Sequence, residues 1–212
     1  MAYTWRMAKH SIPTRDRILK AARHLFQRRG YYAVGTAEIL EASQAPKGSM
    51  YHHFPDGKEQ IAIEAVNAIR ADVQALMRKL EAEGLSVADT FRQLSKGMAR
   101  WLKDSNYREG TMLASTTVGS VPDLPRLHSV IKAAFDEWRA HIVERLMRDG
   151  WPKAAATSTA QTLIAGIEGA MILARIDQDE RVVVKVAESL AESIEVSPHY
   201  SAAEHRPSRA RG

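Results

Sequence analysis

The residues best suited to chemistry lie in "APKGSMYHHFPDGKEQ", residues 45–60, which combines an ammonium, a hydroxyl, a phenol and two adjacent imidazoles: Lys47, Ser49, Tyr51, His52 and His53. Adjacent histidines suggest a metal site. Neighbours on a helix diverge by about 100°, however, and cannot easily hold one ion. The chain has no cysteine and no nearby His-x-x-x-His pair, so we expect neither a metal nor another cofactor. The same groups can instead bond phosphates and base edges.

Motifs typical of enzymes are missing from the sequence. It contains no P-loop, no dinucleotide-binding fingerprint, no H-E-x-x-H and no G-x-S-x-G. His141 lies near Glu137 and Glu144, but that spacing fits an ordinary charged helix face. No apolar run approaches the roughly 18 residues that a membrane span needs, and the polar, basic start does not resemble a signal peptide. We therefore expect a cytoplasmic protein that is not an enzyme and does not bind a membrane.

The positive charge is concentrated at the N-terminal end. Residues 1–60 hold ten Lys and Arg against five Asp and Glu, whereas residues 61–212 hold twenty of each, so the whole formal charge of +5 lies in the first sixty residues. This bias favours an N-terminal surface for a polyanion, on a body with a different task. A basic face that is merely solvated is the alternative.

Apolar residues recur at helical spacing almost throughout, which predicts an all-α protein of about nine helices. The first begins near residue 14 and ends at Gly30, Thr36 caps a short second helix, and the third runs from Pro46 to about His53. A long fourth helix follows and ends near Gly84. Five more occupy residues 87–101, 111–119, 127–146, 153–176 and 181–194. We expect a flexible arm (1–13), a helix-turn-helix unit (14–60), a helical body (61–196) and a disordered tail (197–212).

Two short helices joined by about three residues and braced by a longer first one make a helix-turn-helix, whose last helix enters the major groove of DNA. On that helix Met50 and Phe54 are four residues apart and share the buried side, so the residues between them point outward or to the flanks. Thr36 and Lys58 stand at helix N-termini, which favour phosphate. The predicted DNA contacts are Thr36, Lys47, Gly48, Ser49, Tyr51, His52 and Lys58. His53 lies on a flank, where half-buried packing is the alternative.

The stretch "TRDRILKAARHLFQRRGYYAVGTAEILEASQAPKGSMYHHFPDGKEQIAIEAV" resembles the N-terminal domain of the tetracycline-repressor (TetR) family of bacterial regulators, most specifically in "KGSMYHHF". The resemblance implies a homodimer, most often a repressor, that binds a near-palindromic operator, and it adds His53 to the DNA contacts. Two features depart from the family pattern. Gln44 stands near the turn where the family often has Gly, and the loop "FPDGK" is one residue longer. That loop and parts of the body are similar to a branch that includes drug- and flavonoid-responsive repressors.

Small residues cluster in the eighth predicted helix, at residues 165, 166, 169, 170 and 174. Glycine inside a helix costs roughly 1 kcal/mol relative to alanine, so close packing against another backbone is a plausible compensation. Packing within one chain is the alternative. The resemblance favours dimerisation through the last two helices, which places the interface on Gly166, Gly169, Ala170, Leu190 and Ile194.

The body also carries an aromatic and methionine-rich set with a few polar residues, a composition found in pockets for small apolar ligands. An ordinary core is the alternative from spacing alone, and the resemblance favours a pocket for an effector. The predicted ligand-binding residues are Phe91, Leu94, Met98, Trp101, Thr111, Met112, Ser115, Thr116, Phe135, Trp138, Glu168 and Met171. The competing function is a non-specific architectural DNA-binding protein.

Overall fold

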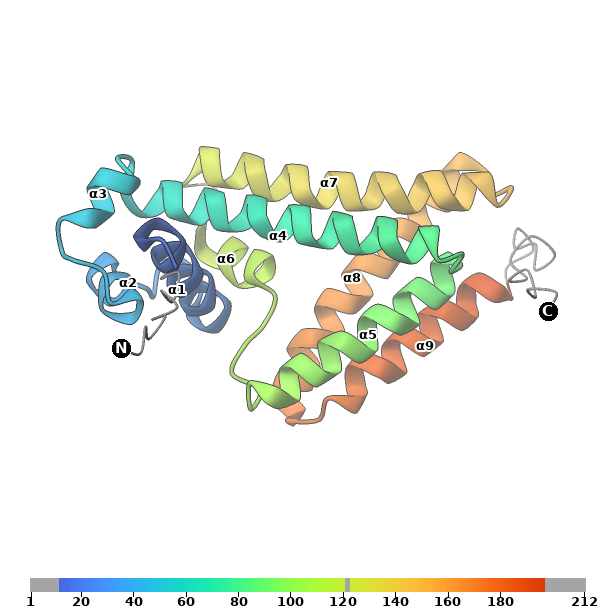
Figure 1. Ribbon diagram of the computed structural model, residues 1–212. Coiled ribbons are helices and arrows are strands. Elements are labelled where there is room, and N and C mark those ends of the chain that lie inside the picture. The colour runs from blue at the N-terminus through green and yellow to red at the C-terminus, as the bar shows by residue number, and fades with distance from the viewer. Residues whose placement is uncertain (1–11, 121–122, 197–212) are drawn as a thin grey trace, which may run out of the picture.

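The computed structural model describes residues 12–120 and 123–196, and every regular element within them is a helix (Figure 1). The expected all-α fold is confirmed for these residues. The expected tail, and the expected arm apart from its last two residues, lie outside them. In chain order the helices are α1 (Thr14–Arg29), α2 (Thr36–Ser43), α3 (Ser49–His53), α4 (Gly57–Ala82), α5 (Val87–Asp104), α6 (Met112–Ser120), α7 (Pro125–Arg148), α8 (Lys153–Asp177) and α9 (Arg181–Glu195).

The N-terminal unit, α1 to α3, forms one end of the molecule (Figure 1). Helix α1 turns Ile18, Ala22 and Phe26 inward, at spacings of four residues, and all three are fully buried. They pack in one apolar cluster with residues of α2, α3 and α4. This cluster also contains residues of α6 and α7, so the apolar core continues across the expected boundary between residues 60 and 61.

Helices α4 and α7 lie side by side along the length of the molecule and run in the same direction (Figure 1). Ion pairs join them in register at three levels: Asp56 and Glu59 with Arg126 at the start of α4, Arg70 with Glu137 in the middle, and Glu81 with Arg148 at the end. Helices α4 to α9 form what we call the body. The N-terminal unit is joined to it at the start of α4, which these ion pairs hold against α7.

The other end of the body consists of α5, α8 and α9, which pack against one another (Figure 1). Ser86 caps α5, because its hydroxyl oxygen accepts a hydrogen bond from the backbone N–H of Asp89 at 3.0 Å. Arg92 on α5 reaches across to the carboxylates of Glu188 and Glu195 on α9. These contacts fix the α5–α9 pair.

Two helix starts differ from the expectation. Gly35, and not Thr36, occupies the cap position of α2, and Thr36 is its first helical residue without a capping hydrogen bond. Helix α3 begins at Ser49 and not at Pro46, because residues 46 to 48 form a turn in which the N–H of Ser49 donates to the carbonyl of Pro46 at 2.9 Å. Among the described helices, none is long and apolar enough to cross a membrane.

Candidate nucleic-acid interface

Helix α3 has one side fixed in the core and the other side free. Met50 is 1% exposed and Phe54 is completely buried, which confirms the predicted inward side. Tyr51 is 65% exposed, and His52 is exposed beside it. A large aromatic side chain at this exposure leaves apolar surface in water, which is common where a partner later covers it.

The turn before α3 has well-defined backbone geometry. Gln44 adopts the left-handed conformation (φ 53°, ψ 35°), and Ala45 N–H donates to the carbonyl of Leu40 while Gln44 N–H donates to that of Glu41. This is the Schellman arrangement that usually places glycine at the left-handed position. The Arg17 guanidinium donates to the carbonyl of Gln44 at 3.2 Å, so α1 braces the turn. The departure from the family's glycine is thus accommodated without a different turn.

The start of α3 leaves Lys47 and Gly48 exposed. A Cβ atom at Gly48 would meet nothing within 4 Å, so the chain offers open space above this backbone. Ser49 is half-buried and its hydroxyl donates to the carbonyl of Pro46 at 2.7 Å, which leaves the oxygen able to accept. The ammonium of Lys47, the backbone of Gly48 and the phenol of Tyr51 therefore all face outward.

The other predicted contacts divide into two groups. Thr36 lies half-buried in the first turn of α2, and its backbone N–H belongs to those that a helix leaves without an internal partner. Lys58 instead points inward. Its ammonium donates to the carbonyls of Tyr31 and Val34 at 3.2 and 3.1 Å and lies 4.1 Å from the centre of the Tyr31 ring. Burial lowers the pKa of Lys58, and in this structure its charge serves the α1–α2 connection.

The two histidine rings pack nearly edge to face, and their nitrogen atoms do not point toward one common site. Their ring centres are 4.9 Å apart at an interplanar angle of 69°, with His52 exposed and His53 half-buried. Over the ranges 12–120 and 123–196, no three His, Asp or Glu residues are grouped to hold a metal ion.

A braced helix-turn-helix with a free outer side, carried on an all-helical body, defines a DNA-binding transcriptional regulator of the helix-turn-helix class. Residues 18–65 match the model of the bacterial regulatory proteins of the tetR family, and residues 87–189 match the C-terminal domain of LmrA/YxaF-like transcriptional regulators. The chain belongs to the TetR family of transcriptional regulators, and the family's members to which it is similar are regulators and not enzymes.

Two curated relatives come from Bacillus subtilis. The chain is 32% identical over 181 residues to the uncharacterized HTH-type transcriptional regulator YxaF, covering 84% of this chain and 93% of that protein. It is 34% identical over 164 residues to the HTH-type transcriptional regulator LmrA, covering 76% and 85%. A solved TetR transcriptional regulator from Legionella pneumophila has the same fold, with a TM-score of 0.76 at 22% identity, over 87% of this chain and 98% of that one.

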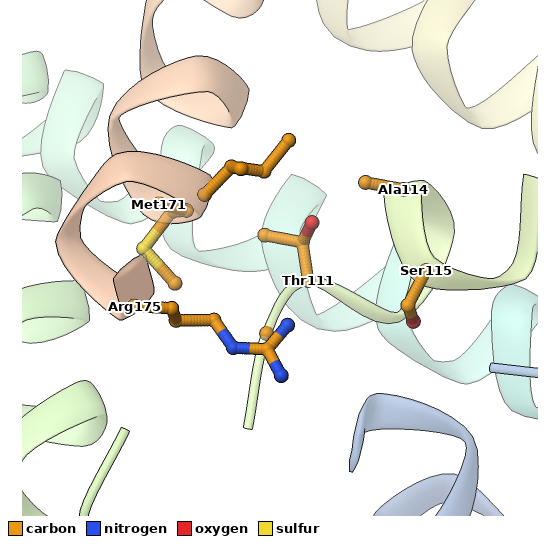
Figure 2. Close-up of a pocket in the computed structure, with 7 residues that line it drawn as sticks. Thr111, Ala114, Ser115, Met171 and Arg175 are labelled. Carbon is orange, nitrogen blue, oxygen red and sulfur yellow. The ribbon is translucent and has the colours of Figure 1, made fainter. Parts of the chain in front are cut away.

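The predicted ligand-binding residues do not all meet in one place. Only Thr111, Ser115 and Met171 line a hollow between the start of α6 and the last turns of α8 (Figure 2). We call it the α6–α8 hollow. It measures about 190 Å³ and is completed by Gly110, Ala114, Ile172 and Arg175.

Other predicted pocket residues are core residues. Phe91 and Met112 are buried in separate apolar clusters, Thr116 is buried, and Met98 and Trp101 pack on the cluster around Leu102. Leu94 is half-buried on α5. Phe135 and Trp138 form an edge-to-face pair with ring centres 5.4 Å apart, between two clusters. Phe91, Met112 and Thr116 therefore lie in the core, and Met98 and Trp101 are half-buried against it.

The predicted polar residue Glu168 lies behind the hollow. Its carboxylate accepts a hydrogen bond from the hydroxyl of Thr111, which does line the hollow. Burial raises the pKa of Glu168, and the bond from Thr111 opposes that rise. The pair connects α8 to the segment that leads into α6.

The wall of the hollow also holds the N-terminal unit. The hydroxyl of Ser115 donates to the carbonyl of Phe26 on α1 at 3.0 Å, and the N–H of Gly110 donates to the carbonyl of Gln27 at 3.1 Å. Gly30 touches the same wall, because a Cβ atom there would lie 2.5 Å from the backbone oxygen of Ser115. Sequence reasoning could not find this junction, since its partners are more than eighty residues apart.

Most of the predicted dimer residues pack within their own chain. A Cβ atom at Gly166 would lie 2.7 Å from a methyl group of Leu190, while Ala170 and Ile194 are each 1% exposed. The glycine thus lets α9 approach α8, which is the intrachain alternative. Gly169 has open space around it, on a side of α8 that continues with exposed apolar side chains: Ile172, Leu173 and Ile176.

Proposed function

We propose that this TetR-family regulator is a homodimeric repressor that binds a near-palindromic operator through α3. The observation that carries the proposal is the orientation of α3, whose Met50 and Phe54 are locked in the core while Tyr51 and Lys47 face out. Lys47 is suited to a phosphate or a guanine edge, and Tyr51 to a phosphate or a thymine methyl group. Gly48, Ser49, Thr36, His52 and His53 complete the contact surface, in the cytoplasm where the bacterial chromosome lies.

The dimer is supported by the exposed side of α8. Leu173 and Ile176 are 50% and 71% exposed. Gly169, one to two turns earlier on α8, would allow a second copy of the helix to approach closely. A surface of this kind suits an isologous contact, in which the same patch of two subunits meets across a two-fold axis. The two copies of α3 would then enter successive major grooves about 34–36 Å apart.

The effector is a small, largely apolar molecule that binds in the body. Binding in the α6–α8 hollow would affect the DNA-binding unit most directly. Ser115 lines the hollow and also bonds α1, so a ligand that shifts α6 must shift the N-terminal unit. Release of DNA requires that the ligand prefer one arrangement over the other, because equal affinity for both changes nothing. A preference of about 1–3 kcal/mol would relieve repression about 5–150-fold.

The test is a titration of wild-type protein with DNA fragments selected from the source genome, read by fluorescence anisotropy at one salt concentration. A repressor should prefer its selected site over a scrambled duplex by about 10³-fold or more. Equal affinity for every duplex would instead establish the architectural alternative.

Replacing Tyr51 by alanine should weaken binding to the selected site by about 5–150-fold, the loss expected for one base-reading side chain. Lys96→Ala provides the control, because Lys96 is an exposed lysine on α5 in the body. Tyr51→Ala protein with wild-type affinity would refute α3 as the reading helix.

A further inference from the structure

A second hollow lies at the junction between the N-terminal unit and the body. It measures about 470 Å³ and collects side chains from α1, α2, the α5–α6 connection and α8. We call it the arginine hollow, because four of its lining residues are arginines and one is a glutamate: Leu25, Arg28, Arg29, Glu38, Arg108 and Arg175. Four positive charges against one negative charge leave a net charge of +3 around it.

The described part of the chain does not neutralise this charge. Arg29 pairs with Glu38, which accounts for the one carboxylate. The Arg175 guanidinium donates only to the backbone carbonyls of Tyr107 and Arg108, at 3.3 and 3.4 Å. Within the described chain, Arg28 and Arg108 are exposed and no carboxylate is paired with either.

Many of the other described arginines pair with carboxylates, although Arg17, Arg78, Arg100 and Arg145 do not. Partners of this kind hold Arg15, Arg23, Arg70, Arg92, Arg126, Arg139, Arg148 and Arg181. Three guanidinium groups that share a hollow without a counter-charge repel one another, and this repulsion would be relieved by a bound anion. The grouping of three such guanidinium groups around one hollow therefore favours a binding site over an ordinary charged face.

The charge and the geometry favour phosphate. A guanidinium presents paired N–H donors that match both carboxylate and phosphate oxygens. A carboxylate brings one negative charge, whereas a phosphate monoester brings about 1.5 to 2 at pH 7 and three acceptor oxygens. Three unneutralised guanidinium groups are matched better by the phosphate.

The arginine hollow adjoins an apolar surface. Arg175 lines both this hollow and the α6–α8 hollow, where Met171, Ile172 and Ala114 supply the apolar wall (Figure 2). Gly110 makes room for the shared guanidinium, because a Cβ atom there would lie 2.7 Å from Nη1 of Arg175. A molecule with a charged end and an apolar end could thus contact both hollows at once.

We propose that the two hollows together bind an organic phosphate with an apolar tail, its phosphate among Arg28, Arg108 and Arg175 and its tail on Met171 and Ile172. Since α1 supplies Arg28 and α8 supplies Arg175, the bound phosphate bridges the N-terminal unit and the body. Affinity then depends on how the two are arranged, which is the condition for an effector. The effector role rests on the repressor function proposed above, whereas the binding itself does not.

The test is isothermal titration calorimetry of the full-length chain without DNA, in about 100 mM salt, where charges more than roughly 10 Å apart are screened. Octyl phosphate should bind saturably and at least about tenfold more tightly than octan-1-ol or octanoate, as expected for several charge-assisted hydrogen bonds. Arg28→Gln and Arg108→Gln should each weaken octyl phosphate about fivefold or more. Arg78→Gln is the matched control, because Arg78 is an exposed arginine on α4 outside both hollows.

Absence of saturable binding, equal affinity for octan-1-ol, or unchanged affinity in both arginine variants would each overturn the proposal. Equal affinity for octanoate would overturn the choice of phosphate. If the two variants lose DNA affinity and salt dependence while octyl phosphate binds as before, the arginines contact the DNA backbone and the proposal is wrong. Because the titration contains no DNA, its failure leaves operator binding intact, and a failure of operator binding leaves this result intact.

Discussion

At the scale of single residues, two ionisable side chains lie where their charged forms are disfavoured. Burial lowers the pKa of Lys58, which donates to carbonyls between α1 and α2. Burial raises the pKa of Glu168, which accepts from Thr111 beside the α6–α8 hollow. Each side chain therefore has a local structural role, which a single substitution can test.

Lys58→Ala should leave the salt dependence of operator binding unchanged, because the Lys58 ammonium is already held by two carbonyls. Lys47→Ala, at the exposed start of α3, should reduce the slope of log K against log salt by about one unit. The slopes come from anisotropy titrations at four salt concentrations. If Lys58→Ala also reduced the slope by one unit, Lys58 would contact a DNA phosphate, as its position at a helix N-terminus predicted.

Glu168→Gln should make the stability of the protein less dependent on pH. A carboxyl whose pKa is raised in the folded state stabilises the fold below its unfolded pKa, near 4.5, and this contribution is lost as pH rises through the raised value. The variant should therefore be more stable than wild type at pH 7, with a difference that shrinks toward pH 4.5. Urea unfolding at several pH values measures this.

Glu192→Gln, on the exposed side of α9, is the control for that series and should follow the wild-type pH profile. If Glu168→Gln were less stable than wild type at neutral pH, the Thr111 bond to the ionised carboxylate would outweigh the cost of burial.

At the scale of secondary-structure elements, the contact between α1 and α6 joins the body to the DNA-binding unit. The bonds from Ser115 to Phe26 and from Gly110 to Gln27 bring α6 and its approach directly against the end of α1. Gly30 follows α1 in the left-handed region (φ 74°) with its Cα against the Ser115 carbonyl. Only glycine fits there without strain.

Gly30→Ala should destabilise the protein by about 1–3 kcal/mol, because the added methyl group must clash with backbone in a conformation that L-residues avoid. Gly97→Ala is the control: Gly97 is inside α5, a Cβ atom there meets nothing within 4 Å, and alanine should stabilise the helix by up to about 1 kcal/mol. Chemical denaturation of both variants measures the difference. Equal stabilities would show that the α1–α6 contact is looser than described.

At the scale of the whole molecule, three features suit the two-fold arrangement proposed for the dimer. The DNA-binding unit is at one end, and the parallel pair α4 and α7 runs the length of the molecule (Figure 1). One side of α8 carries exposed apolar side chains. The side carries Leu173 and Ile176. A second copy covering it would fix the separation of the two α3 helices.

The double variant Leu173→Glu, Ile176→Glu should be monomeric, because pairing the two copies would bury four carboxylates on an apolar surface. Light scattering after gel filtration should then give a mass near 23.6 kDa in place of twice that value. Operator affinity should fall with the loss of the second α3. Leu76→Glu, at an exposed leucine on α4, is the control and should remain dimeric. A double variant that stays dimeric would move the interface away from this side of α8.

The sequence by itself determined the helices and their inward sides, because helical periodicity is a local property. The spacing of Met50 and Phe54 identified the buried side of α3 before any neighbour was known, and the structure confirms it. The positions of the nine described helices follow from the same periodicity, and the motif around Tyr51 was enough to place the chain in its family.

The tertiary structure alone decided which distant residues meet, because periodicity says which way a side chain faces and not what lies there. The carbonyls that hold Lys58 come from residues more than twenty positions earlier, and Gly166 faces Leu190 on the next helix. The same reason explains why the expected pocket residues do not all meet in one place. Arg28, Arg108 and Arg175 have no sequence pattern in common, and only the packing of α1 against the body brings their charges to one hollow.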